Sequence, residues 1–151
     1  MDYIALWNKF SAVPGGKKVF SLLLGKIIPY TGSMGATVQE LARGRACVTL
    51  RDRRGVRNHL KSIHAVALMN LGELTSGLAA VAGLPPSMRG ILVGYRIEYL
   101  KKARGTITAT SCFDAKPSGE SKQYEVSVEM KNQRGELVSR AFATWLIGPS
   151  T

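Results

Sequence analysis

The chain has 151 residues, of which 45% are hydrophobic and 21% charged; this is the profile of a globular domain and excludes a mainly disordered, collagen-like or coiled-coil protein. Lys and Arg number 21 against 10 Asp and Glu, so the net charge is +11 and polyanions, nucleic acid or small phosphorylated ligands, are candidate partners. No apolar run reaches the length of a membrane span and the first residues show no signal pattern, so we expect a cytoplasmic protein.

Two helices are predicted at the start of the chain, from Asp2 to Ala12 and from Lys17 to Ile28. Apolar residues of the first recur near helical spacing, and Pro14-Gly15-Gly16 ends it. The second is rich in Val, Phe and Leu and ends before Pro29. We interpret residues 1–30 as a helical extension that contributes packing rather than chemistry.

Strands are predicted for most of the remaining chain. Apolar and polar residues alternate there with a period of two, which places one strand face on a core and the other in solvent. The predicted strands cover residues 36–41, 46–52, 93–99, 106–113, 124–130 and 137–147. Turn sequences separate the last three strands: Pro117-Ser118-Gly119 and Asn132-Gln133-Arg134-Gly135.

One long helix is predicted among these strands, from Ala65 to Ala82, with Gly83 as its C-terminal cap. Gly72 and Gly77 each cost helix stability, up to about 1 kcal/mol, so they indicate that another element packs very close to this helix. Two strands, one buried helix and four further strands predict an α+β fold in which a curved antiparallel sheet wraps around the helix. We expect one domain over residues 1–151.

The cysteines and histidines form no recognisable framework. Cys47 and Cys112 make no C-x-x-C pair and are interpreted as reduced thiols on strands. His59 and His64 have no Cys or carboxylate at ligand spacing, so we expect no metal site.

The segment before the long helix reads Asn58-His59-Leu60-Lys61-Ser62-Ile63-His64-Ala65-Val66, and Glu73 follows inside the helix. It resembles the PaaI-like acyl-CoA thioesterases of the hot-dog superfamily. Their pattern is an Asn, a His-Gly-Gly six residues later, and an Asp or Glu nine residues after that His. Asn58, His64 and Glu73 match this pattern in type and spacing. The later sequence VGYRIEYLKKARG is similar to the family's third long strand and the loop after it, so the resemblance covers about residues 35–148.

The resemblance implies a hot-dog fold, hydrolysis of an acyl-CoA to free acid and coenzyme A, and a homodimer or dimer of dimers with composite sites. Coenzyme A enters as part of the substrate, and no other cofactor is implied. Ala65 and Val66 stand where the family has two glycines. The first glycine's N–H is the family's oxyanion donor; Ala65 retains that N–H but adds a Cβ, and Val66 adds bulk beside it.

Elementary chemistry supports roles for the same positions. The N–H groups of Ala65 and Val66 lack intrahelical partners at the positive end of the helix dipole, which suits a thioester carbonyl as it gains charge. Glu73 is predicted to activate the attacking water. The alternative is a Glu73 at the helix rim, solvated or paired with an arginine.

The other two polar positions have weaker assignments. Asn58 is predicted to hold the water or to position Glu73, and a plain loop asparagine is the alternative. His64 is expected to fix the loop through hydrogen bonds. The nine residues from His64 to Glu73 rotate about 180° on a helix, so Glu73 is expected to serve the site of a neighbouring chain.

Basic residues fall into two clusters. Arg43 to Lys61 holds seven basic residues against one acid, and Arg96 to Arg104 holds four against one. We predict that Lys101, Lys102 and Arg104 hold the phosphates of coenzyme A, and a solvated basic surface is the alternative.

Two other functions remain open. A non-catalytic acyl-CoA-binding or acyl-carrier-binding hot-dog protein is favoured by the loss of both glycines. A nucleic-acid binder fits the charge, but only 7% of residues are aromatic and no RNA-binding or DNA-binding motif is present, so we expect no nucleic-acid partner. The apolar residues around the long helix favour a medium or long acyl chain.

Overall fold

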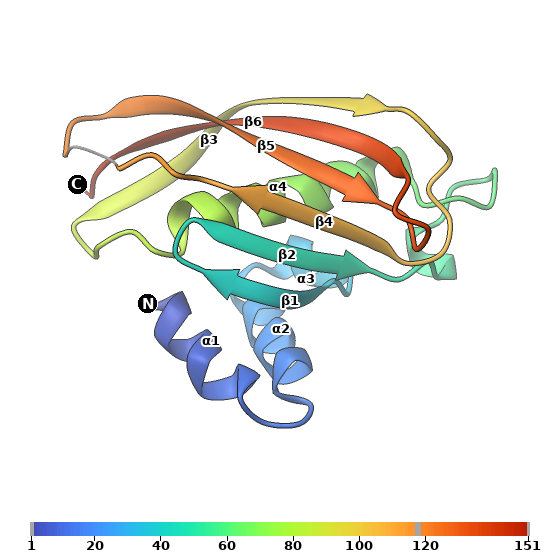
Figure 1. Cartoon of the computed structure of the whole chain (residues 1–151), viewed down its shortest axis with the longest axis horizontal. Helices are drawn as coiled ribbons and strands as arrows, with labels where there is room; N and C mark the ends of the chain where they lie inside the picture. The colour runs from blue at the N-terminus through green and yellow to red at the C-terminus, as the bar shows by residue number, and fades with distance from the viewer. Residues whose placement is uncertain (1, 117–118, 151) are drawn as a thin grey trace.

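A computed structural model, which describes residues 2–116 and 119–150, shows a six-stranded antiparallel sheet curved around one long helix (Figure 1). The helices are α1 (Tyr3–Ser11), α2 (Gly16–Ile27), α3 (Pro29–Ser33), η1 (Arg54–Val56) and α4 (Ala65–Val81). The strands are β1 (Thr37–Ala42), β2 (Arg45–Leu50), β3 (Met88–Tyr99), β4 (Ile107–Cys112), β5 (Lys122–Lys131) and β6 (Leu137–Pro149). The predicted α+β architecture is confirmed.

The strand order in the sheet is β1-β2-β4-β5-β6-β3, so β1 and β3 are its two edges. The longest pairing joins β3 to β6, from Met88 opposite Pro149 to Tyr99 opposite Ser139. It contains a register shift between Leu92 and Gly94, an irregularity of the kind that bends and twists a sheet. The sheet curvature leaves a concave face that α4 fills.

Close contact between α4 and the sheet depends on the two glycines inside the helix. A methyl group at Gly72 would collide with the Tyr95 hydroxyl and the end of Met130. A methyl group at Gly77 would lie 3.0 Å from the ring of Trp145. The prediction that an element packs very close to this helix is therefore confirmed.

The end of α4 differs from the prediction. The helix ends with Ala82 in the right-handed conformation, and Gly83 does not adopt the positive φ of a left-handed cap. Gly83 instead lies against Arg43, because a methyl group there would come within 2.8 Å of that side chain. The hairpin turn at residues 132–135 is confirmed by Gly135, with φ of 77°. Pro117 and Ser118 of the other predicted turn lie outside the described residues.

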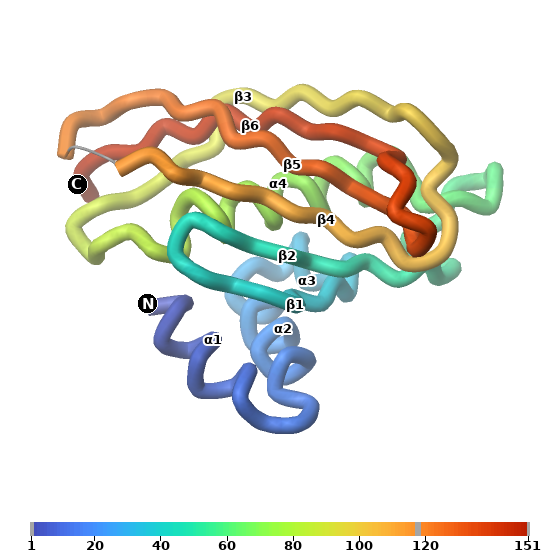
Figure 2. The backbone as a smooth tube through the Cα atoms, in the orientation of Figure 1, coloured from blue at the N-terminus to red at the C-terminus, as the bar shows by residue number. Residues whose placement is uncertain are grey.

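The N-terminal helices lie on the β1 side of the sheet (Figures 1 and 2). The rings of Trp7 and Phe20 join α1 to α2 edge to face, with centroids 5.1 Å apart. Ser21 of α2 accepts a hydrogen bond from the backbone N–H of Val38 in β1 at 2.9 Å. The short helix α3 was not predicted; it starts at Pro29, where a missing N–H costs nothing. Among the described residues no helix is both long and apolar enough to cross a membrane.

Candidate active site

The first turn of α4 is capped by His64. The residue has extended backbone angles, and its Nδ1 accepts a hydrogen bond from the N–H of Val66 at 3.1 Å. Its own N–H donates to the carbonyl of Val56 at 2.8 Å. An imidazole that accepts through Nδ1 carries its proton on Nε2 when neutral. The geometry therefore gives His64 the loop-fixing role that the sequence suggested, while a direct part in chemistry stays a prediction.

Capping satisfies only part of the first turn of α4. His64 takes up the N–H of Val66 and its carbonyl accepts from Leu68, whereas the described part of the chain shows no acceptor for the N–H groups of Ala65 and Ala67. The carbonyl of Ala65 accepts a hydrogen bond from the Tyr99 hydroxyl of β3 at 3.0 Å, which fixes this peptide against the edge strand. The helix start thus presents the N–H groups of Ala65 and Ala67 at the positive end of the dipole, while His64 occupies that of Val66.

Asn58 organises the loop that leads into α4. Its Oδ1 accepts hydrogen bonds from the N–H of Leu60 at 2.9 Å and from the N–H and hydroxyl of Ser62 at 3.2 and 3.3 Å. Such a side-chain turn fixes the backbone locally. The structure thus shows Asn58 as a loop-positioning residue, and its contact with a water remains a prediction.

Glu73 lies on α4 in an apolar cavity of about 130 Å³. The residue is half-buried, and burial raises the pKa of its carboxyl above the usual value. Within residues 2–116 and 119–150 its carboxylate has no hydrogen bond or ion pair, so the alternative of an arginine partner finds no support. The cavity walls come from three helices and β6: Tyr3, Leu24, Ile28, Leu74, Gly77, Leu78, Val81, Ala82 and Trp145.

The helix start and Glu73 are separated within one chain. Glu73 stands eight positions after Ala65, which is about 12 Å along a helix and a rotation of about 80°. His64 and Val66 line a different cavity, of about 400 Å³, that also includes Asn70. Within one chain the two groups therefore differ in both height and direction on the helix.

Two loops meet at the end of the molecule where α4 begins. The N–H of Ile63 donates to the carbonyl of Ala103 at 2.8 Å, which ties the segment before α4 to the loop after β3. Asp52 accepts from the N–H of Gly105 at 3.1 Å and pairs with Arg57, and these contacts hold the pKa of its carboxyl below the usual value. The predicted phosphate-binding loop therefore lies beside the helix start.

The predicted phosphate-binding residues differ in whether they already pair with a carboxylate. Lys101 pairs with Glu136 at 2.8 Å, and together with a hydrogen bond from Asn132 it lowers the pKa of Glu136 to about 2. Lys102 and Arg104 are exposed and form no ion pair within the described part of the chain.

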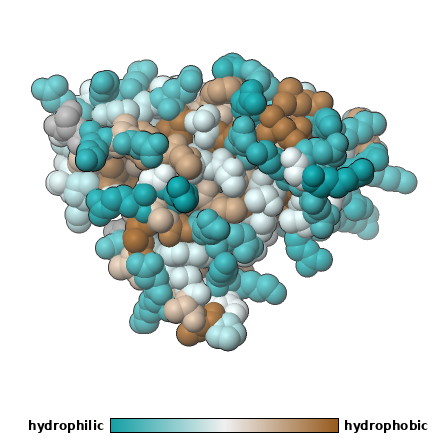
Figure 3. Space-filling view, in the orientation of Figure 1, coloured by the Kyte–Doolittle hydropathy of each residue, from teal (hydrophilic) through white to brown (hydrophobic). Residues whose placement is uncertain are grey.

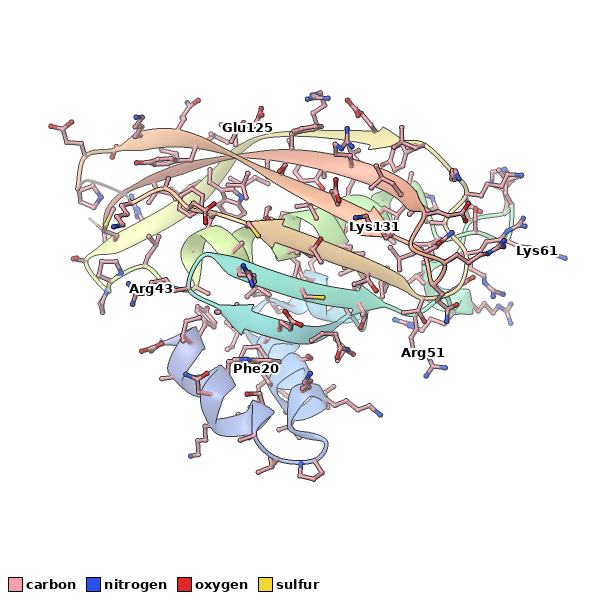
Figure 4. The ribbon with its side chains drawn as sticks, in the orientation of Figure 1. Phe20, Arg43, Arg51, Lys61, Glu125 and Lys131 are labelled. Atoms are coloured by element: carbon pink, nitrogen blue, oxygen red, sulfur yellow. The ribbon has the colours of Figure 1, made fainter. Side chains whose placement is uncertain are left out.

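Sequence reasoning missed that the first basic cluster divides between the two ends of the sheet. Figure 4 shows Arg51 and Lys61 at the end where α4 begins and Arg43 at the opposite end. Arg54 and Lys61 are exposed, and they join Lys102 and Arg104 around the start of α4. The charge count was available from the sequence, but only the loop-to-loop hydrogen bonds show which cations come together.

The β3 edge and the adjoining face of α4 carry exposed apolar side chains. Ile91 and Val93 on β3 are 46% and 48% exposed, and Val66 on α4 is 47% exposed. Tyr99, Leu100 and Met69 extend the same region. An open strand edge flanked by apolar side chains is characteristic of a surface that another chain covers.

Comparison with known proteins gives a family and a fold. The family model described as "Domain of unknown function (DUF4442)" matches residues 16–147, a range that includes α2 and α3. A structural-genomics crystal structure is 29% identical, with 98% of each chain covered and a TM-score of 0.81. No curated protein matches this chain in sequence.

Two more distant structures carry functional descriptions. A Pseudomonas aeruginosa protein, described as of unknown function and a probable thioesterase, is 20% identical, with 91% of this chain and 97% of that chain covered and a TM-score of 0.75. A Haemophilus influenzae thioesterase is 12% identical, with 83% and 88% covered and a TM-score of 0.73. These likenesses confirm the predicted hot-dog fold. The match over residues 16–147 shows that this chain belongs to the DUF4442 family.

Proposed function

We propose that this protein is an acyl-CoA thioesterase that hydrolyses its substrate to a free acid and coenzyme A. The observation that carries the proposal is the half-buried carboxylate of Glu73, for which the described residues show no partner, on the same helix whose start presents the N–H of Ala65. A general base and an oxyanion donor are the two groups that thioester hydrolysis needs. The thioesterase descriptions of the two distant structures agree with this assignment.

The proposed reaction uses these two groups in one cycle. Glu73 accepts a proton from a water, whose oxygen attacks the thioester carbon. The carbonyl oxygen becomes an oxyanion, which the N–H of Ala65 stabilises by a hydrogen bond at the positive end of α4. The C–S bond then breaks, and the departing thiolate receives the proton from Glu73. The products are a carboxylic acid and the free thiol of coenzyme A.

A homodimer brings the two groups together. The midpoint between Ala65 and Glu73 on α4 is Met69, whose side chain is 37% exposed. If two α4 helices pack antiparallel about a two-fold axis near Met69, the helix start of one chain lies opposite Glu73 of its partner. The two β3 edges flank this axis and can pair, which removes both open edges. We infer two composite sites per dimer.

Coenzyme A is proposed to lie with its phosphates on the basic loops beside the helix start. Lys102 and Arg104 are the predicted ligands, and Arg54 and Lys61 add to the positive field there. Lys101 contributes less because Glu136 already neutralises it. No bound group besides the substrate is required by this chemistry.

One observation favours the second candidate, a non-catalytic acyl-CoA-binding protein. Val66 places an exposed β-branched side chain at the helix start, and His64 takes up its N–H. The N–H of Val66 is then unavailable to the oxyanion, and loss of a donor costs catalysis about 100-fold to 1,000-fold.

Free-thiol release from a panel of acyl-CoA esters, from short to long and including aryl groups, tests the proposal. Wild type and Glu73→Ala are measured in parallel, with calorimetric binding of the same esters. We expect turnover by wild type and loss of turnover with retained binding in Glu73→Ala. Binding without turnover by wild type would support the second candidate, and equal turnover by both proteins would contradict the role of Glu73.

A further inference from the structure

A second concave site lies on the β1 side of the molecule, between α2, the α3–β1 junction and the end of β2. Its volume is about 490 Å³, within the range of about 300–1,000 Å³ that small-molecule sites occupy. Its floor consists of the buried side chains of Leu24, Val38 and Leu74, and Leu22, 69% exposed, forms one wall. We call it the α2 groove. Leu24 and Leu74 also line the Glu73 cavity, so they form the partition between the two sites.

Cations surround this apolar floor. Lys18 and Lys26 come from α2 and Arg51 from the end of β2, and the described lining of the α2 groove contains no carboxylate. The three cations take part in no ion pair within the described residues. Like charges around an apolar concavity repel one another, and a bound anion relieves that repulsion. The charge of the groove therefore complements an anionic ligand.

Two of the three hydroxyl side chains of the lining are already engaged. The Ser21 hydroxyl donates to the carbonyl of Lys17 at 2.7 Å and accepts from the N–H of Val38. The Thr31 hydroxyl donates to Oδ1 of Asn70 at 3.1 Å. No aromatic side chain occurs in the described lining. A nucleotide, which needs stacking and base-edge hydrogen bonds, therefore fits poorly, and a plain aliphatic chain fits well.

We propose that the α2 groove binds a fatty acid anion, with its aliphatic chain on the Leu24, Val38 and Leu74 floor and its carboxylate among the three cations. The N-terminal helices then build a ligand site instead of serving only as packing. Figure 3 shows hydrophobic and hydrophilic residues side by side over this lower part of the molecule. The proposal concerns binding alone and does not depend on the proposed hydrolysis, although hydrolysis of an acyl-CoA would release an acid of this class.

The test measures binding of dodecanoate by calorimetry, below the concentration at which it forms micelles. The groove variant Lys18→Gln/Lys26→Gln/Arg51→Gln is compared with a control that loses the same charge at exposed positions elsewhere, Lys9→Gln/Arg43→Gln/Arg89→Gln. We expect the groove variant to bind about tenfold more weakly and the control to stay within about twofold of wild type. Equal affinity of the groove variant and wild type would overturn the proposal.

A second variant tests the apolar part of the site. Leu22→Gln keeps all three cations and removes the exposed wall, so we expect weaker dodecanoate binding. Unchanged affinity would show that the ligand does not use the groove wall and would contradict the proposal. Retained binding by Glu73→Ala is also expected, and it separates this site from the proposed hydrolysis, whose failure leaves dodecanoate binding intact.

A vesicle measurement distinguishes a free fatty acid from a lipid surface, because both present anions beside apolar chains. Wild type is sedimented with phosphatidylglycerol vesicles and with phosphatidylcholine vesicles. We expect dodecanoate to bind in solution without vesicles. Sedimentation with phosphatidylglycerol that the groove variant loses, combined with no dodecanoate binding, would assign the three cations to a membrane surface and overturn the proposal.

Discussion

The two edge strands of the sheet, β1 and β3, differ in whether another part of the chain covers them. Helix α2 lies along β1, and the Ser21 hydroxyl accepts the N–H of Val38 on that edge. At the other edge residues 2–116 and 119–150 place no further element over β3, where Ile91 and Val93 are about half exposed. An open edge invites another strand, so proteins cover, shorten or charge it. One edge is therefore completed within the chain, and in the proposed homodimer a second copy would complete the other.

The largest expected effect comes from breaking the proposed contact at the β3 side. Met69→Arg places a charge on the inferred two-fold axis, where it would be buried without a partner. We expect a monomer in analytical ultracentrifugation and loss of at least 100-fold in thiol release, because each composite site loses its partner. Val13→Arg, at a 53% exposed position between α1 and α2, is the control and should leave both properties unchanged. A monomer that retains full activity would refute composite sites.

A smaller effect is expected in the loop that follows the open edge. Lys102→Gln/Arg104→Gln removes two exposed cations from the proposed phosphate site, so KM for an acyl-CoA should rise about tenfold. A truncated thioester of N-acetylcysteamine lacks the phosphates, and its KM should not change. Equal increases for both substrates would place the two residues outside the coenzyme A site.

The contribution of α2 to the covered β1 edge can be tested by removing the hydrogen bond between Ser21 and Val38. Ser21→Ala leaves the N–H of Val38 without its acceptor, which should lower the free energy of unfolding by about 1 kcal/mol. For a chain of this size that corresponds to a decrease in Tm of about 2–4 °C in calorimetry. The oligomeric state should not respond. A shift toward larger oligomers would show that the β1 edge can also pair with another chain.

The smallest effect concerns Glu73, which lies between the two edges on α4. Because burial raises its pKa in the folded state, folding favours the protonated form, and stability is lost as pH rises through the folded pKa. Glu73→Gln should therefore raise Tm at pH 7, by about 1–3 °C after allowance for solvent screening, and the difference should vanish below about pH 4. A lower Tm at pH 7 would show that the charged carboxylate has a stabilising partner.

The same shift of the Glu73 pKa sets the pH dependence of the proposed reaction. A general base must be ionised, so kcat should rise with pH through a pKa above the usual range for glutamate. Measurement of kcat between pH 4 and 9 checks this. A rate already at its plateau at pH 4 would contradict a buried carboxylate base.

Local sequence patterns predicted most of the fold. Alternation located the strands, and Gly72 and Gly77 indicated the close contact between α4 and the sheet. The errors occurred where local signals are ambiguous. The second helix ends before Pro29 as predicted, but Pro29 also begins the short helix α3, which was not predicted. A glycine after a helix can serve as its C-terminal cap or leave room for a neighbouring side chain. Gly83 leaves room for Arg43.

The candidate site was less predictable because its parts meet through distant contacts. The spacing from His64 to Glu73 placed both on one helix, and the cap at His64 follows from its position. Nothing local indicated that Ala103 would join the segment before α4, or that Glu136 would neutralise Lys101. Such pairings depend on loops that are 35 or more residues apart and so leave no periodic signal.

Mixing two inactive variants tests composite sites most directly. Glu73→Ala removes the base, and Ala65→Pro removes only the oxyanion donor, since proline is well accepted at the first position of a helix. After the two proteins are unfolded and refolded together, half of the dimers carry both chains, and each has one site with both groups intact. We expect thiol release at about a quarter of the wild-type rate in the mixture and none from either variant alone. A mixture as inactive as its components, with mixed dimers shown to form, would contradict it.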